Sequence, residues 1–237
     1  LYKQTDAKSQ VTTLTYDALG RVLTRTETGL TSTWTYDTGS GKGIGKLATA
    51  TTGSNYTRTL SYDALGRPLT TQLTVDGTAS TYTSGYDSNG RLSSVTYPSG
   101  LVLLYVYTST GYLCRMADNT GSPTCSAGGG SQIFWTANTR DAEMHLTEAI
   151  AGNGVITDQA FDPNTGLIQS ITAGPIGSPT SVADFVYGFD TLGNLTNRQD
   201  VIENYTERFC YDSLNRLTNY AIGATCTSTG TKTVGYE

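Results

Sequence analysis

The hexapeptide YDALGR occurs twice in this chain, at residues 16–21 and again at residues 62–67. Two close variants follow it, YDSNGR at 86–91 and YDSLNR at 211–216. The shared pattern is an aromatic residue, an aspartate, two variable residues, a glycine and often an arginine. Recurrence of one short pattern along a chain is typical of a repeat architecture, in which each unit buries its apolar face against its neighbours.

Local physical chemistry explains why the pattern has these residues. Aspartate in the first place and glycine in the fourth are typical of a type I turn, in which the carboxylate accepts backbone N–H groups. The glycine can adopt the left-handed conformation that a three-residue hairpin loop with a bulge requires. Asn215 stands in the glycine place of one copy, and asparagine is the residue that best tolerates this conformation. The following arginine can pair with the aspartate across the turn. Each copy therefore predicts a β-hairpin.

The predicted fold is all-β, an antiparallel β-hairpin repeat array. The structural motif residues of the copies that keep the pattern are Tyr16, Asp17, Gly20, Arg21, Tyr62, Asp63, Gly66, Arg67, Tyr86, Asp87, Gly90, Arg91, Phe189, Asp190, Gly193, Tyr211, Asp212, Asn215 and Arg216. Looser copies begin at Tyr36, Tyr97, Tyr107 and Phe161, and Trp135 is expected to begin a degenerate copy that runs through Asp141.

Composition supports this fold and excludes several classes of partner. The chain has 237 residues, a net charge of −5 and only 15% charged residues, and its 16 tyrosines outnumber its 5 phenylalanines. Tyrosine and threonine favour strands. The acidic balance argues against a nucleic-acid partner, and no apolar run approaches a membrane span. We also expect no cofactor, because no dinucleotide or phosphate-binding fingerprint lies between a strand and a helix.

Four cysteines, Cys114, Cys125, Cys210 and Cys226, are candidates for disulfides. Their spacing favours the local pairs Cys114–Cys125 and Cys210–Cys226, although four thiols on buried strands are the alternative. Disulfides would indicate an oxidising, extracytoplasmic setting. A zinc site is not expected, because the chain has no Cys-x-x-Cys sequence and a single histidine, His145.

Catalytic groups are not expected either. Half of the 14 aspartates occupy the turn place of the repeat, and acidic residues outside it, such as Asp141, Glu143, Glu148 and Asp184, are scattered. His145 is interpreted as part of a degenerate hairpin. Five tyrosines outside the motif place could stack on glycans, although cross-strand pairing is the simpler interpretation. These speculative glycan contacts are Tyr56, Tyr82, Tyr112, Tyr205 and Tyr220.

The repeated Tyr-Asp-x-x-Gly-Arg pattern resembles the Rhs/YD-repeat family over residues 16–236. That family includes shell-forming subunits of bacterial toxins and the animal teneurins. The resemblance implies that the hairpins form a curved, spiralling sheet that is part of a hollow shell, and YD repeats have also been linked to carbohydrate binding. We expect residues 1–237 to be a single run of repeats from a longer chain, with a Gly/Ser-rich loop at about 117–131.

Two functional hypotheses follow from this resemblance. The first is a wall segment of a large secreted or cell-surface protein, whose partners are the rest of the same chain and an enclosed passenger such as a toxin domain. The second is an extracellular adhesion or carbohydrate-binding module, or a filament-forming subunit, whose partners are glycans or identical chains. Neither hypothesis involves an enzyme, nucleic acid or a membrane span.

Overall fold

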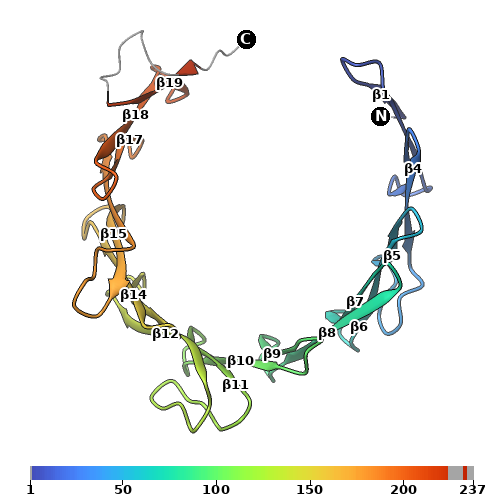
Figure 1. Ribbon diagram of the computed structural model, residues 1–237, viewed down its shortest axis with the longest axis horizontal. Coiled ribbons are helices and arrows are strands. Elements are labelled where there is room, and N and C mark those ends of the chain that lie inside the picture. Colours follow the sequence, from blue (N-terminus) through green and yellow to red (C-terminus); the bar gives the residue numbers. More distant parts are fainter. Residues whose placement is uncertain (1, 224–231, 234–237) are drawn as a thin grey trace. The chain divides into compact units, whose positions relative to one another are not determined.

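The computed structural model describes residues 2–223 and 232–233, and its regular structure consists of β-strands (Figure 1). The chain divides into two compact units, unit 1 (Leu1–Tyr105) and unit 2 (Val106–Glu237). In the part of the chain that the structure describes, no helix has the length and apolar character that crossing a membrane requires. The predicted all-β fold is confirmed, whereas curvature and closure into a hollow shell stay predictions.

Unit 1 is a meander in which each strand pairs antiparallel with the next along the chain. Its strands are β1 (Lys3–Thr5), β2 (Val11–Tyr16), β3 (Val22–Glu27), β4 (Leu30–Tyr36), β5 (Leu47–Thr52), β6 (Tyr56–Tyr62), β7 (Pro68–Val75), β8 (Thr78–Tyr86), β9 (Leu92–Thr96) and β10 (Val102–Tyr107), which continues into unit 2.

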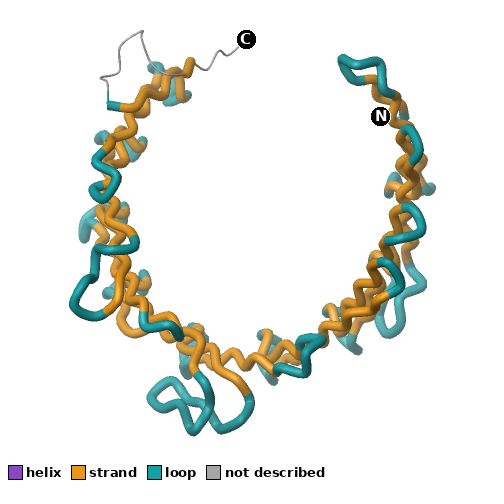
Figure 2. Tube along the Cα trace, viewed as in Figure 1, coloured by secondary structure: helices purple, strands orange, loops and turns teal. Residues whose placement is uncertain are grey.

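Unit 2 repeats this arrangement from β11 onward. Its strands are β11 (Leu113–Asp118), β12 (Ile133–Arg140), β13 (Leu146–Ala151), β14 (Val155–Phe161), β15 (Ile168–Pro175), β16 (Ala183–Phe189), β17 (Leu195–Asp200), β18 (Tyr205–Tyr211), β19 (Leu217–Ile222) and β20 (Lys232–Thr233). Residues 119–132 leave the sheet between β11 and β12, and Figure 2 shows them as a long loop.

The motif turns join every second pair of successive strands, so within each unit they all lie at the same end of the strands. In unit 1 they join β2 to β3, β4 to β5, β6 to β7 and β8 to β9. The strand register shifts at each of these turns, and Tyr16 pairs with Val22 after such a shift. This shift is the bulge that the glycine makes possible, because Gly20 has a φ of 78°.

Two of the looser copies are placed differently from the prediction. Tyr97 lies in the turn between β9 and β10, at the opposite end of the strands from the motif turns. It occupies the aspartate place of that turn, because its N–H donates to Leu101 O at 2.8 Å and its O accepts from Gly100 N at 2.9 Å. Trp135 lies inside β12 and pairs with Ala151, so it begins no turn. The sequence search failed there because the true turn, 141–145, has Arg140 in the aromatic place.

The two faces of unit 1 differ in chemistry. The register aligns threonines of successive strands on one face, since alternate residues of a strand share a face. One row across β2 to β7 consists of Thr15, Thr24, Thr33, Thr51, Thr57 and Thr74. From β2 to β8 the strand positions of this threonine face hold no charged residue. The opposite face holds Arg25 and Arg58, which pair with Ser32 and Ala50 of the neighbouring strands.

Neither described unit builds a thick apolar core. The apolar residues with little exposure are mostly small, and they are Ala48, Leu60, Tyr62 and Leu103 in unit 1 and Cys114, Ala117, Ala149, Ala173 and Ala221 in unit 2. Most strand residues are half-buried. Hydrogen-bonded turns and contacts between neighbouring strands must therefore supply much of what a core supplies elsewhere.

The turn glycine offers the first test of this fold. We expect Gly20→Val to lower the free energy of unfolding by about 1–2 kcal/mol, because a side chain at a positive φ is strained. No atom lies within 4 Å of the Cβ that the substitution would add, so the backbone alone carries the cost. Gly20→Asn should cost clearly less, because Asn215 adopts a φ of 58° in the same place. Urea titration measures both variants, and equal losses would contradict this account.

Candidate functional site

The repeated turn is built around one aspartate carboxylate. In the first copy, Asp17 Oδ1 accepts from the backbone N–H groups of Leu19 and Arg21, both at 2.9 Å. Its Oδ2 accepts from Arg21 Nε at 2.6 Å. One side chain therefore satisfies two turn N–H groups and also binds a guanidinium, which a neutral asparagine cannot do equally well.

Other copies reproduce this geometry with small variations. Asp63, Asp87 and Asp212 bind the N–H and Nε groups of the arginine four residues on at 2.7–3.0 Å. In the copy at Asp190, Asn194 takes the arginine place and donates from Nδ2 to Asp190 Oδ2 at 2.9 Å. The copies thus share the carboxylate contacts even where the arginine is absent.

Turn 141–145 is a further copy that the aromatic pattern did not identify. Asp141 Oδ1 accepts from His145 N at 2.9 Å, and Met144 takes the left-handed position with a φ of 71°. His145 Nδ1 lies 2.9 Å from Asp141 Oδ2 and 3.8 Å from Glu143 Oε2. The histidine therefore occupies the arginine place of a hairpin, and the prediction that His145 belongs to a degenerate hairpin is confirmed.

The hydrogen bonds of these turns lower the pKa of their aspartates. In Asp17 and Asp212, the largest cause is the backbone hydrogen bond from the arginine four residues on, Arg21 or Arg216. In Asp190 it is the side-chain hydrogen bond from Asn194. A carboxyl whose pKa is lowered by folding stabilises the fold above its ordinary pKa, and this stabilisation is lost as the pH falls through the lowered value.

Three basic residues of unit 1, Arg21, Lys46 and Arg67, also reach the next copy of the motif. Arg21 lies 4.4 Å from the centre of the Tyr36 ring and donates from Nη2 to Asp37 Oδ2 at 2.7 Å. The Tyr36 hydroxyl in turn donates to Val22 O at 3.1 Å. Stacking of a cation on a ring and a hydroxyl-to-backbone bond therefore join two successive turns. We call this pair of contacts the motif ladder.

The motif ladder continues along unit 1. Lys46 lies 5.5 Å from the centre of the Tyr62 ring, and the Tyr62 hydroxyl donates to Leu47 O at 2.6 Å. Arg67 lies 4.0 Å from the centre of the Tyr86 ring, whose hydroxyl donates to Pro68 O at 2.7 Å. Tyr36, Tyr62 and Tyr86 are thus each held by the copy before them.

Unit 2 contains the same contacts in altered form. His145 stacks on Phe161 with 4.4 Å between ring centres and 20° between ring planes. The Tyr211 hydroxyl donates to Leu195 O at 3.0 Å. Phenylalanine at position 161 keeps the stacking contact and loses the hydroxyl bond.

The lengthened turn 37–46 reinforces one step of the motif ladder. Ser40 O accepts from Tyr62 N at 2.9 Å, so the turn lies against the next copy. Gly41 passes so close to the Tyr62 carbonyl, with a φ of 80°, that a side chain would not fit. Here the glycine-rich sequence permits a close backbone approach.

The structure joins Cys114 and Cys125 by a disulfide, with 5.4 Å between their Cα atoms. Cys226 lies outside the described residues, so the predicted pair Cys210–Cys226 stays a prediction. No group of three or more histidine, cysteine, aspartate or glutamate residues is placed to hold a metal ion within residues 2–223 and 232–233.

The five tyrosines proposed as glycan contacts do not form one site. Tyr82 meets Tyr97 edge-on at 5.7 Å in unit 1, where Tyr56 pairs with Val75. In unit 2, Tyr112 lies under Arg140. Only Tyr205 and Tyr220 share a neighbourhood, which also contains Phe209 and Glu207. Tyr220 lies 5.6 Å from the Phe209 ring and donates to Glu207 Oε1 at 2.8 Å.

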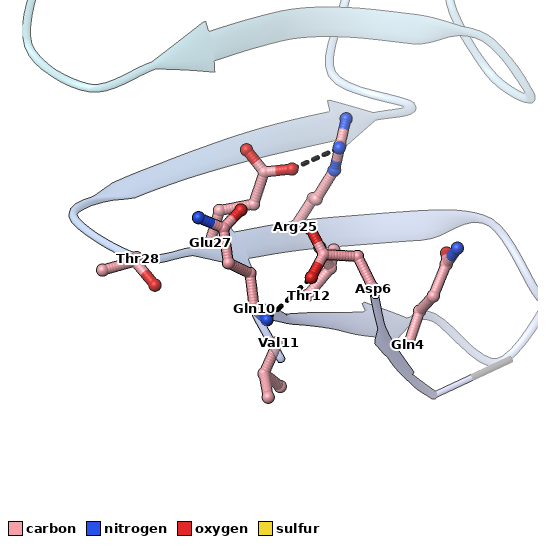
Figure 3. A pocket seen from close by; sticks show the side chains of 8 residues that line it. All are labelled: Gln4, Asp6, Gln10, Val11, Thr12, Arg25, Glu27 and Thr28. Carbon is pink, nitrogen blue, oxygen red and sulfur yellow. Dashed lines mark hydrogen bonds and ion pairs between the residues drawn. The ribbon is translucent and has the colours of Figure 1, made fainter. Parts of the chain in front are cut away.

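A polar hollow of about 390 Å³ lies beside β1, β2 and β3 (Figure 3). Its walls are Gln4, Asp6, Gln10, Val11, Thr12, Arg25, Glu27 and Thr28. The charged groups already have partners, because Arg25 is paired with Glu27 and Asp6 accepts from Gln10 N at 2.8 Å. The hollow therefore presents mainly amide and hydroxyl groups to a ligand.

Comparison with known proteins identifies the family. The sequence model of the teneurin YD-shell matches residues 2–130. The chain belongs to the teneurin YD-shell family. The predicted resemblance to YD-repeat proteins is thereby confirmed. None of the curated proteins matches the chain closely enough to count as a relative.

Solved structures share the fold at low sequence identity. A crystal structure of TcdB2-TccC3-Cdc42 has a TM-score of 0.57 and 17% identity, and the match covers 92% of this chain and 13% of that one. A TcdB2-TccC3-TEV structure has a TM-score of 0.56, 18% identity and the same coverage. A Photorhabdus luminescens Tc holotoxin pore with mutated TccC3 has a TM-score of 0.54 and 16% identity over 94% of this chain and 15% of that one. The chain thus spans a small part of these structures.

The motif ladder can be tested through one hydroxyl. We expect Tyr62→Phe to lower the free energy of unfolding by about 0.5–1.5 kcal/mol, because Leu47 O loses its donor while the ring stays. Tyr82→Phe is the matched control, since its ring meets Tyr97 and lies outside the motif ladder. Both variants are measured by chemical unfolding. An equal loss in both would show that the motif ladder adds nothing specific.

A second test concerns two carboxyls that face each other across strands. Asp158 pairs with Glu148, and its pKa is raised, first by burial and then by the charge of Glu148. A carboxyl whose pKa is raised by folding destabilises the fold at neutral pH and ceases to do so below its ordinary pKa.

We therefore expect Asp158→Asn to raise the free energy of unfolding at pH 7 by a few tenths to about 1 kcal/mol. This gain should disappear below about pH 4. Unfolding at a series of pH values measures it. A gain that persists at low pH would contradict the charge-repulsion account.

Proposed function

We propose that this chain forms part of the wall of a large secreted or cell-surface YD-shell protein that encloses a passenger, such as a toxin domain. The observation that carries the proposal is the motif ladder. It ties successive hairpins of unit 1 to each other through stacking and hydroxyl contacts, so that a strip of single hairpins can hold together without a thick core. Membership of the YD-shell family supports the same role.

The role is containment without catalysis. A wall must exclude solvent and proteases, which requires continuous strand pairing. Unit 1 offers two faces of different chemistry for these tasks, the threonine face, which holds no charged residue at the strand positions from β2 to β8, and the face with Arg25 and Arg58. The Cys114–Cys125 disulfide favours an extracytoplasmic location. The partners would then be the rest of the same chain and the passenger.

Extracellular adhesion through carbohydrate is a second candidate, favoured by one observation. Tyr205 is 36% exposed and lies on the same face of β18 as Phe209, and an exposed aromatic ring can stack on a sugar. A glycan array probed with the chain and with Tyr205→Ala distinguishes the candidates, because binding lost in the variant would favour adhesion.

The wall proposal predicts that only one face meets the passenger. Arg58 and Thr59 are consecutive, exposed and on opposite faces of β6. A photoreactive amino acid is placed at each position of the full-length protein in turn. We expect irradiation to cross-link the passenger from one of the two positions and not from the other, as mass spectrometry would show. Cross-links from both positions, or from neither, would contradict enclosure and favour an open filament or an adhesin.

A further inference from the structure

The loop 119–132 of unit 2 is anchored to the sheet at two separate places. Its base is fixed by Asp118, which is 8% exposed and whose Oδ1 accepts from Thr120 Oγ1 at 2.7 Å and from Gln132 N at 3.0 Å. Asp118 N also donates to Gln132 O at 3.0 Å. None of these contacts involves a cysteine, so the base does not depend on the disulfide.

The tip of the loop, residues 122–129, is held differently. It folds back so that Cys125 is bonded to Cys114 of β11. A hydrogen bond from Arg115 Nη1 to Thr124 O at 2.7 Å also holds the tip, and the Ile133 side chain lies beside Gly128. Within the tip, Ser122 N donates to Gly129 O at 3.2 Å and Thr124 N to Ala127 O at 2.8 Å.

The composition of the tip gives it little stability of its own. Its sequence, SPTCSAGG, has no large apolar side chain to pack against the sheet. A segment with few buried contacts and a glycine-rich backbone opens readily once its covalent attachment is lost. The disulfide is therefore the main restraint on the tip, while the base stays in place.

The chemistry that would open the tip is thiol–disulfide exchange. Cys114 is 6% exposed, whereas Cys125 lies in a half-buried position of the loop. A thiolate of a small dithiol can thus attack Cys125 Sγ and displace Cys114 as a thiolate, which takes up a proton. The second thiol of the reductant then closes its own disulfide and releases Cys125 as a thiol. Two electrons pass from the dithiol to the protein.

We propose that residues 119–132 form a thiol-gated cleavage site, closed to proteases while Cys114 and Cys125 are joined and open once a dithiol has reduced them. The fitting enzyme is an endoprotease that cuts beside small neutral residues, because the tip consists of serine, threonine, alanine, glycine, proline and cysteine. The loop contains no lysine or arginine, so trypsin cannot cut inside it. A cut in the tip would leave β11 and β12 paired.

Limited proteolysis of the full-length protein tests this proposal. We expect elastase to cut within 119–132 roughly a hundredfold faster after dithiothreitol treatment than before it, in line with what closing a loop of this size by a disulfide contributes. Trypsin under the same reducing conditions should leave the loop uncut. Alkylation and mass measurement confirm that both cysteines are reduced.

The variant Cys125→Ser extends the test because it removes the disulfide without any reductant. The substitution is made in the loop, so the buried Cys114 is unchanged. The variant should be cut at the fast rate with or without dithiothreitol. Equal rates before and after reduction of the natural chain would overturn the proposal. So would a loop that stays uncut although both thiols are alkylated, or cleavage that begins outside 119–132.

Discussion

The bidentate use of an aspartate carboxylate is the constraint on which this architecture depends. One oxygen of Asp17 accepts the two N–H groups that a tight turn leaves without strand partners, and the other binds the guanidinium of Arg21. The guanidinium is thereby held in a fixed place. Because it is fixed, it can stack on the Tyr36 ring and bind Asp37 in the next copy. A contact within one turn thus sets up the contact between turns.

This arrangement explains how a sheet with little core can persist. A lone hairpin is marginal in water, because it buries too little apolar surface to offset the entropy of ordering its chain. In this protein the apolar residues with little exposure are mostly alanines and a few leucines. Stacked cations, hydroxyl-to-carbonyl bonds such as that of Tyr62, and threonine-lined strands replace the missing apolar layer. Such contacts act only between neighbours, so the strip can be extended without changing its chemistry.

Departures from the repeat are as informative as the repeat itself. His145 keeps the turn and the stacking contact of an arginine. Asn194 keeps the turn and reaches the next copy through a hydrogen bond from its Nδ2 to Asn215 Oδ1 at 3.1 Å. The excursion 119–132 leaves the sheet at an Asp118-anchored base and returns to it through a disulfide. Because the hairpins on either side are complete, such a change is confined to its own copy. Such a change can therefore be added there without disturbing the strand pairing of the neighbouring copies.

The sequence by itself determined the fold class, the motif turns, the conformation of their glycines and the pairing of aspartate with arginine. These are local properties, since a turn is fixed by residues that are at most a few positions apart. It also predicted the pair Cys114–Cys125 from spacing alone. The tertiary structure placed Tyr97 in a turn at the opposite end of the strands from the motif turns. It also decided which residues meet across copies, such as Arg21, which stacks on Tyr36. Those contacts depend on strand register, and a register shift of one residue moves every side chain to the other face.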